Sequence, residues 1–258
     1  MTGRTVLKYA RAYIDGYDMS GYTRSFGPLG VTFEEHAAAA LSDDITNVLP
    51  GQATISMGTL NGIFDNTATS GLHVITSGSV GIRTVMLPIG MRAAPAAGDE
   101  VFCGQFDQTG YQEEGDGLLT VTIPFAPTAN QSGSKLYSQA WGKLLHANSA
   151  ATGANTATGA GIDHGAQTSL GGFMMYQVFS GSGGDGTATI SIDDSADDSS
   201  YGALTDATTG ELDMSVVRSG IVALGATDTV ERYLRWQISL NGATSVTFAL
   251  AFVRGNGS

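Results

Sequence analysis

The side chains that could carry out chemistry are sparse and far apart in this chain of 258 residues. The histidines are His36, His73, His146 and His164. Each lacks the nearby histidine or cysteine that a zinc site needs at close spacing. The single cysteine, Cys103, lies in the apolar run 101–103, which is typical of a buried strand. We therefore expect no metal ion and no intrachain disulfide.

A glycine-rich segment, Gly181–Gly186, matches the G-x-G-x-x-G spacing of dinucleotide-binding loops. That function needs a helix directly after the loop, because the helix N-terminus holds the pyrophosphate. Here the following residues, Thr187–Ile192, have the pattern of a strand. The segment is therefore interpreted as a turn, and no cofactor is expected.

Carboxylates gather in two places. Asp193–Asp198 contains four aspartates but lacks the spacing of an EF-hand calcium loop. Glu113, Glu114 and Asp116 form the second group, and paired carboxylates can serve glycoside hydrolysis. No aromatic-lined subsite can be identified beside them, so both groups are interpreted as solvated acidic turns. With the G-x-S-x-G motif also absent, the sequence predicts no catalytic, cofactor-binding or metal-binding residue and no enzyme.

The composition favours a subunit of an assembly. Charged residues are 14% of the chain, against about 25% in ordinary soluble domains, and 36 residues are glycine. Small uncharged surfaces suit close subunit packing, so we expect a permanent oligomer. The 24 acidic and 12 basic residues give a net charge of −12. Because the basic residues are scattered, specific DNA binding is disfavoured, whereas an acidic wall along which DNA slides is allowed.

The sequence carries no recognisable targeting signal. No apolar run approaches the ~20 residues needed to cross a bilayer, and no signal peptide is found. We expect a soluble protein that is made in a reducing cytoplasm and has no membrane partner.

Period-two alternation predicts a mainly β fold. It is clearest in Val230–Leu240, which Asn241 and Gly242 follow as a strong hairpin turn. Ser245–Val253 then alternates again, so we expect a C-terminal hairpin. Further strands are expected at Val6–Ile14, Ala53–Met57, Leu72–Thr76, Ile82–Leu87, Val101–Phe106, Leu118–Phe125, Phe173–Phe179, Ala188–Ile192 and Ile221–Leu224.

One helix is expected within residues 33–48. Thr32 and Glu35 have the spacing of a capping box, and the alanine-rich run that follows has high helix propensity. Pro50 bars its continuation.

Residues 127–170 are rich in small residues and show little periodicity after Leu145. We interpret them as a linker or assembly arm. They divide the chain into an N-terminal β-sandwich, 1–126, and a C-terminal β-sandwich module, 171–258.

Two short similarities suggest that these parts are duplicated. Residues 52–56 resemble 187–191, and residues 121–123 resemble 246–248, in the same order along the chain. A duplication would give two related β-sandwich or barrel-like domains in one chain. Short matches of this kind also arise by chance in β proteins, so both alternatives stay open.

The N-terminal segment resembles a known family. Tyr13–Thr23 reads YIDGYDMSGYT and resembles the opening motif of bacteriophage major tail-tube proteins. An acidic stretch at Phe33–Glu35 and a glycine-rich segment at Gly51–Asp65 follow in the order those proteins have. The C-terminal part resembles a β-module frequent in phage virion proteins, in the runs Ala188–Asp197, Arg232–Arg235 and Val246–Ala249.

The resemblance implies a structural virion protein of the phage tail, synthesised in the bacterial host cytoplasm. Its subunits would form stacked rings that make a DNA-conducting tube, with DNA as non-specific cargo and other tail proteins as partners. Three copies would complete a ring if the halves are duplicated, and six if they are not. Such lumens are typically electronegative, which agrees with the net charge.

Other structural and binding roles remain as alternatives. Similar β-modules occur in capsid decoration and other head-associated proteins, and a tail terminator or distal tail protein can share the tube fold. A carbohydrate-binding tail module is a third alternative, with Trp141 and Trp236 as its aromatic candidates. Because Trp236 alternates with Leu234 and Ile238, core packing explains it better.

Overall fold

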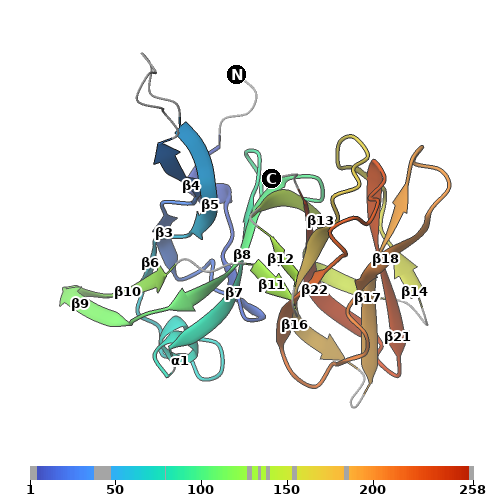
Figure 1. Cartoon of the computed structure of the whole chain (residues 1–258). Helices are drawn as coiled ribbons and strands as arrows, with labels where there is room; N and C mark the ends of the chain where they lie inside the picture. Colours follow the sequence, from blue (N-terminus) through green and yellow to red (C-terminus); the bar gives the residue numbers. More distant parts are fainter. Residues whose placement is uncertain are drawn as a thin grey trace, which may run out of the picture.

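The protein is built almost entirely of β-strands (Figure 1). The structure, a computed structural model, describes residues 5–37, 48–78, 80–126, 130–132, 135–137, 140–152, 156–182 and 186–255. Within these ranges the helical elements are one α-helix, α1 (Leu72–Thr76), and a 3-10 turn, η1 (Leu7–Tyr9). The expected fold class, mainly β with sandwich or barrel-like layers and a short helix, is confirmed.

One antiparallel sheet runs through the molecule from its N-terminal to its C-terminal part. Its main path, in spatial order, is β2 (Tyr17–Asp18), β1 (Tyr13–Ile14), β7 (Gly81–Ile89), β8 (Glu100–Gln108), β13 (Trp141–Thr152), β22 (Ser245–Arg254), β16 (Gly172–Ser182) and β20 (Arg218–Ala223). Strand β13 pairs with β8 on one side and with β22 on the other. Residues 141–152 of the expected linker are therefore part of this shared sheet, although their composition did not predict a strand.

A four-stranded layer packs on the N-terminal end of this sheet. Its order is β9 (Gln112–Asp116), β10 (Leu118–Ala126), β6 (Thr59–Ile63) and β3 (Thr23–Gly27). The end of β10 also pairs with β8, so layer and sheet curl into a half-barrel. Between them lies a core that includes Leu60, Val85, Phe102, Phe106 and Val121.

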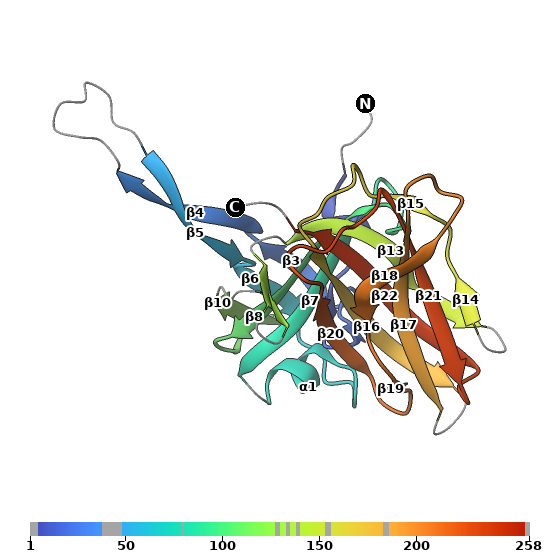
Figure 2. The same ribbon diagram turned by 45° about the vertical axis from the view of Figure 1, so that its right-hand side comes forward.

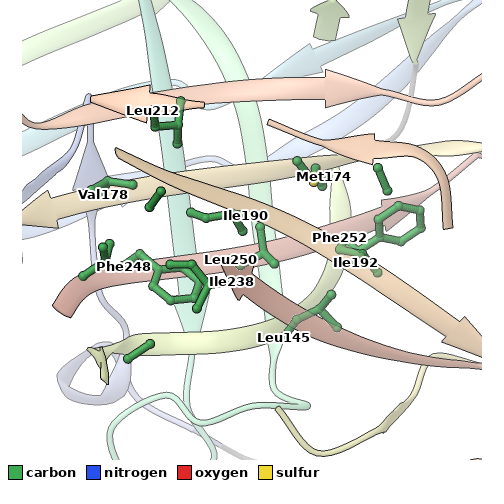
Figure 3. Packing of buried hydrophobic residues seen from close by; sticks show 14 of the residues in the cluster. Leu145, Met174, Val178, Ile190, Ile192, Leu212, Ile238, Phe248, Leu250 and Phe252 are labelled. Carbon is green, nitrogen blue, oxygen red and sulfur yellow. The ribbon is translucent and has the colours of Figure 1, made fainter. Parts of the chain in front are cut away.

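A second layer packs on the C-terminal end. Its strands are β14 (Thr156–Thr158), β15 (Ile162–Asp163), β21 (Tyr233–Asn241), β17 (Thr187–Ser195), β18 (Gly202–Thr208) and β19 (Leu212–Asp213). Figure 3 shows how Ile190 and Ile238 from this layer meet Phe248 and Leu250 of the main sheet. The result is a two-layer β-sandwich with a continuous apolar core.

Two small sheets complete the described fold. Strands β11 (Asn130–Ser132) and β12 (Lys135–Tyr137) pair with each other. Strands β4 (Gly30–Ala37) and β5 (Val48–Ser56) form a hairpin ladder that projects away from the body, as Figure 2 shows.

The helix expected at 33–48 is wrong for the residues that are described. Residues 33–37 continue β4 and Val48 begins β5, whereas residues 38–47 lie outside the described ranges. Inter-strand pairing overrides the capping signal here, since Val31 pairs with Ile55 and Phe33 with Ala53.

The short helix lies instead at Leu72–Thr76, where a strand was expected. This five-residue segment, in which only Leu72, Val74 and Ile75 are apolar, is too short to be assigned to helix or strand by periodicity alone. The turn before the helix is tight, because a Cβ at Gly71 would lie 2.5 Å from the Asp65 carbonyl oxygen. That tight turn delivers Leu72 into the core, where it is fully buried.

The expected C-terminal hairpin is also wrong, although both strands exist. Strand β21 pairs with β14, β15 and β17, whereas β22 pairs with β13 and β16. The turn at Asn241 and Gly242 therefore carries the chain from one layer of the sandwich to the other. The reason is burial. Residues Phe248–Val253 of β22 are buried on both faces, so this strand must lie in the interior of a sheet whose two faces are both covered.

The structure also bears on the first expected strand and on the expected duplication. Only Tyr13–Ile14 of the expected strand Val6–Ile14 is β, with η1 before it. The similar segments 52–56 and 187–191 lie in non-equivalent places, the first in the projecting hairpin and the second in the sandwich layer. These segments therefore give no support to a duplication, and the domain boundaries remain a prediction.

Candidate functional site

The carboxylates of Asp193–Asp198 bind groups of the chain itself. Asp193 Oδ2 accepts hydrogen bonds from Arg235 Nη2 at 2.8 Å and from Nε at 3.1 Å. Asp197 Oδ1 accepts the backbone N–H of Ser200 at 3.1 Å, and this bond, with others from the same turn, lowers the pKa of Asp197. Within the described ranges no group of three histidine, cysteine or acidic side chains is placed to hold a metal ion.

The second acidic group lies on β9, where Glu113 contacts other side chains and Glu114 and Asp116 face solvent. Glu113 Oε1 lies 3.1 Å from His73 Nδ1, and the Tyr111 hydroxyl lies 2.8 Å from the same nitrogen. Burial raises the pKa of Tyr111, and the hydrogen bond with Glu113 adds to that effect. This cluster ties β9 to α1. Glu114 and Asp116, on the same strand, are exposed.

The glycine-rich candidate is followed by a strand, as expected. Gly181 and Ser182 end β16, residues 183–185 lie outside the described ranges, and Thr187 begins β17. The described residues on either side of this loop are strands, so the helix N-terminus that dinucleotide binding requires is not formed by them.

Two histidines are structural parts of the C-terminal sandwich. His164 Nε2 donates to the Phe252 carbonyl at 3.0 Å, and Nδ1 accepts from Arg254 Nε at 3.2 Å. Burial, with the neighbouring Arg254 charge, lowers the pKa of His164 to about 4. The His146 ring stacks on Phe248 with centroids 4.0 Å apart, and burial lowers its pKa as well.

The tryptophans and the cysteine pack against the protein interior. Trp236 lies edge-on to His146 and Phe248, at centroid distances of 4.6 and 5.6 Å, so the expected core role holds. Trp141 is 40% exposed and packs edge-on against Phe102. Cys103 is fully buried, and burial raises the pKa of its thiol.

The exposed apolar side chains concentrate in the N-terminal part. Of 13 large hydrophobic residues that are exposed within the described ranges, 10 precede residue 127. Phe33 on β4 is 50% exposed and Leu49 on β5 is 55% exposed. His36 shares this hairpin and lies 3.7 Å from Glu34, with both side chains in solvent. The alanine-rich run predicts a helix for this segment, so the exposed apolar surface of the hairpin could not be expected from the sequence.

A polar face covers the outer side of the sheet β9–β10–β6–β3. Thr122 Oγ1 donates to Asn61 Oδ1 at 3.1 Å, and Asn61 Nδ2 donates to Ser25 Oγ at 3.2 Å. Thr120 donates to the Glu114 carbonyl on the same sheet. The central side chains of this face are thus uncharged and hydrogen-bonded, and the exposed Arg24 of β3 lines the same hollow.

Comparison with known proteins gives little. No family model matches the chain, and no curated protein is similar to it in sequence. Among solved structures it is similar to the Dit protein (gp 19.1) of phage SPP1, with 9% identity, 93% of this chain and 98% of that chain covered, and a TM-score of 0.33. The SPP1 protein is described as a paradigm of the hub adsorption apparatus in phages that infect Gram-positive bacteria. Among the described residues no helix is long and apolar enough to span a membrane.

Proposed function

We propose that the chain is a non-catalytic structural protein of a phage tail, whose copies assemble into stacked rings that form the DNA-conducting tube. The proposal starts from the resemblance of Tyr13–Thr23 and the segments after it to tail-tube proteins. It places the protein in the virion, with other copies of itself and other tail proteins as partners.

The projecting hairpin β4–β5 is the observation that carries the proposal. Its base is held in the core through Ile55 and, in part, Val31. Farther out, Phe33 and Leu49 are exposed, and β4 pairs with no described strand except β5. An isolated two-stranded hairpin is marginally stable in water. A neighbouring subunit that covers Phe33 and Leu49 would supply the missing apolar contact.

The polar face on the sheet β9–β10–β6–β3 supports the proposed passage of DNA. Its central side chains, Ser25, Asn61 and Thr122, are uncharged and already hydrogen-bonded. Arg24 is the cation that lines this hollow, so phosphates would meet little positive charge there, and the net charge of −12 opposes adhesion further.

Negative-stain electron microscopy of the purified full chain at high concentration tests the proposal. We expect rings or hollow tubes. Monodisperse monomers would contradict it. Trimers or monomers that bind only to expanded capsids would favour the head-associated alternative, which has no specific structural support here.

A further inference from the structure

Three cations that make no ion pair within the described chain line one pocket at the N-terminal edge of the molecule. The arginines that pair with described carboxylates lie elsewhere, such as Arg235 on β21. Lys8, Arg11 and Arg24 instead line a pocket of about 250 Å³ between η1 and β3. Arg11 bonds to backbone carbonyls, those of Lys8 at 3.3 Å and Ala10 at 2.9 Å. In a chain with 12 basic residues and a net charge of −12, this is an unusual concentration of positive charge.

We propose that this basic pocket binds the acidic β9–β10 turn of a second copy of this chain. The inference rests on the proposed function, and it names the surfaces through which neighbouring copies of a ring meet. The partner surface carries Glu114 and Asp116, which are exposed and have no ion pair within the described chain.

The two surfaces also match in their apolar content. Leu118, directly after the acidic turn, is 51% exposed. Leu7, which lines the basic pocket, is 46% exposed, and Phe26 lines it as well. Oppositely charged groups flanked by apolar side chains are what a specific interface combines.

The sheet geometry places the two surfaces at opposite free edges. Among the described strands β9 pairs only with β10, and β3 pairs only with β6. All pairings in the order β9–β10–β6–β3 are antiparallel, so β9 and β3 run in opposite directions. A second copy that adds its β9 beside β3 would therefore extend the sheet in the same antiparallel pattern.

Such a contact joins two different surfaces, and it therefore repeats from copy to copy. Heterologous contacts of this kind close into a ring when the rotation between copies is suitable. Figure 1 shows the β9–β10 hairpin extending from the body, where it is free to reach a neighbour. The cluster of His73, Tyr111 and Glu113 holds the base of that hairpin in place.

Charge reversal at each edge tests the pairing. The double variant Arg11→Glu, Arg24→Glu turns the β3 edge acidic, so that both the β3 and the β9 edges are acidic. The double variant Glu114→Lys, Asp116→Lys turns the β9 edge basic, so that both edges are basic. We expect each to associate at least about tenfold more weakly than the native chain in sedimentation velocity, because like charges then face each other. The quadruple variant with all four changes keeps the net charge and restores opposite edges, so its association should return to within about threefold of native.

Mixing the two double variants adds a second readout. Alternating copies satisfy every contact in a ring of six, whereas a ring of three cannot alternate and retains one repulsive contact. Restored rings in the mixture would support the pairing and a six-copy ring. Recovery in the quadruple variant alone would support the pairing and a three-copy ring.

Glu211→Lys is the control, since Glu211 is exposed in the C-terminal sandwich away from both edges. It should associate as the native chain does, and circular dichroism should confirm that every variant is folded. If the variant Arg11→Glu, Arg24→Glu folds and assembles like the native chain, the proposed pairing is overturned, whereas ring assembly itself is not. If neither the quadruple variant nor the mixture recovers, the pairing is overturned as well. A native chain that stays monomeric at all concentrations overturns the proposed function, and this inference with it.

Discussion

The N-terminal half-barrel and the C-terminal sandwich share one sheet but differ in how many of their charged and apolar groups find partners within the chain. The sandwich binds its own charges: Arg235 pairs with the buried Asp193, and Arg254 donates to the Val230 carbonyl and to Thr168. The half-barrel pairs Arg83 with Asp15, but Lys8, Arg11 and Arg24 have no ion-pair partner in the described chain. It also has two strand edges with no neighbouring described strand and a hairpin that projects from the body. Its apolar side chains, Phe33 among them, lie in solvent far more often.

This difference suits two distinct roles for the two halves. Natural proteins usually protect free strand edges and cover apolar hairpins, because both promote association. A half that leaves them open agrees with the proposed contact with other subunits, whereas the sandwich covers its core within the described chain. If the contrast holds, substitutions in the sandwich should change stability, and substitutions in the half-barrel should change assembly.

The largest effect is expected from Phe248→Ala in the core of the sandwich. Phe248 is fully buried, stacks on His146 and meets Trp236 edge-on. Truncation leaves a large cavity and should lower the free energy of unfolding by about 3–5 kcal/mol. Urea unfolding followed by tryptophan fluorescence measures it, and a loss below about 1 kcal/mol would show that the sandwich core tolerates large gaps.

The next effect is a decrease in the free energy of unfolding as the pH falls, caused by histidines of the sandwich. The pKa of His164 is lowered from 6.5 to about 4 in the folded state. The unfolded chain therefore binds the proton first, and the stabilising contribution, complete above pH 6.5, is lost as the pH falls toward 4. The lost free energy is about 3 kcal/mol, and His146, whose pKa is also lowered, acts in the same direction. Asp163, with its pKa lowered to about 2, contributes only in a more acidic window.

Urea unfolding at pH 7 and at pH 4.5 tests this dependence. The variant His164→Asn should show a flatter profile, and His36→Asn, a change on the exposed hairpin, should keep the native one. A native profile that is flat over this interval would refute the assignment to His164.

A third effect should distinguish a buried ion pair of the sandwich from an exposed one. Arg235→Met leaves Asp193 buried without its cation and should cost about 2–3 kcal/mol. Arg232→Met removes the partner of Asp163 at the surface, where solvent screens both charges, and should change stability far less. Equal losses in the two variants would mean that burial does not distinguish these pairs.

Much of this architecture can be predicted from the sequence, and the failures have physical causes. Alternation located β7, β8, β10, β16, β17 and β22 because each has one or two buried faces. It could not assign β21 and β22 to different sheets, since partner choice depends on the long-range burial of both faces of Phe248–Val253. The basic pocket could not be predicted from the sequence either, because Lys8, Arg11 and Arg24 come together only when η1 folds beside β3.

The smallest effect on stability is expected from Phe33→Ala in the projecting hairpin. Phe33 is half exposed, so the change should alter the unfolding free energy of the monomer by less than about 0.5 kcal/mol. Its effect on assembly should be the reverse, because the same side chain would be buried against a neighbour. We therefore expect fewer or shorter tubes in electron micrographs at a concentration where the native chain assembles. Ile55→Ala at the buried base of the hairpin is the matched control and should destabilise the monomer instead. If Phe33→Ala destabilises the monomer and leaves assembly unchanged, the hairpin belongs to the fold, and the contrast between the two halves fails there.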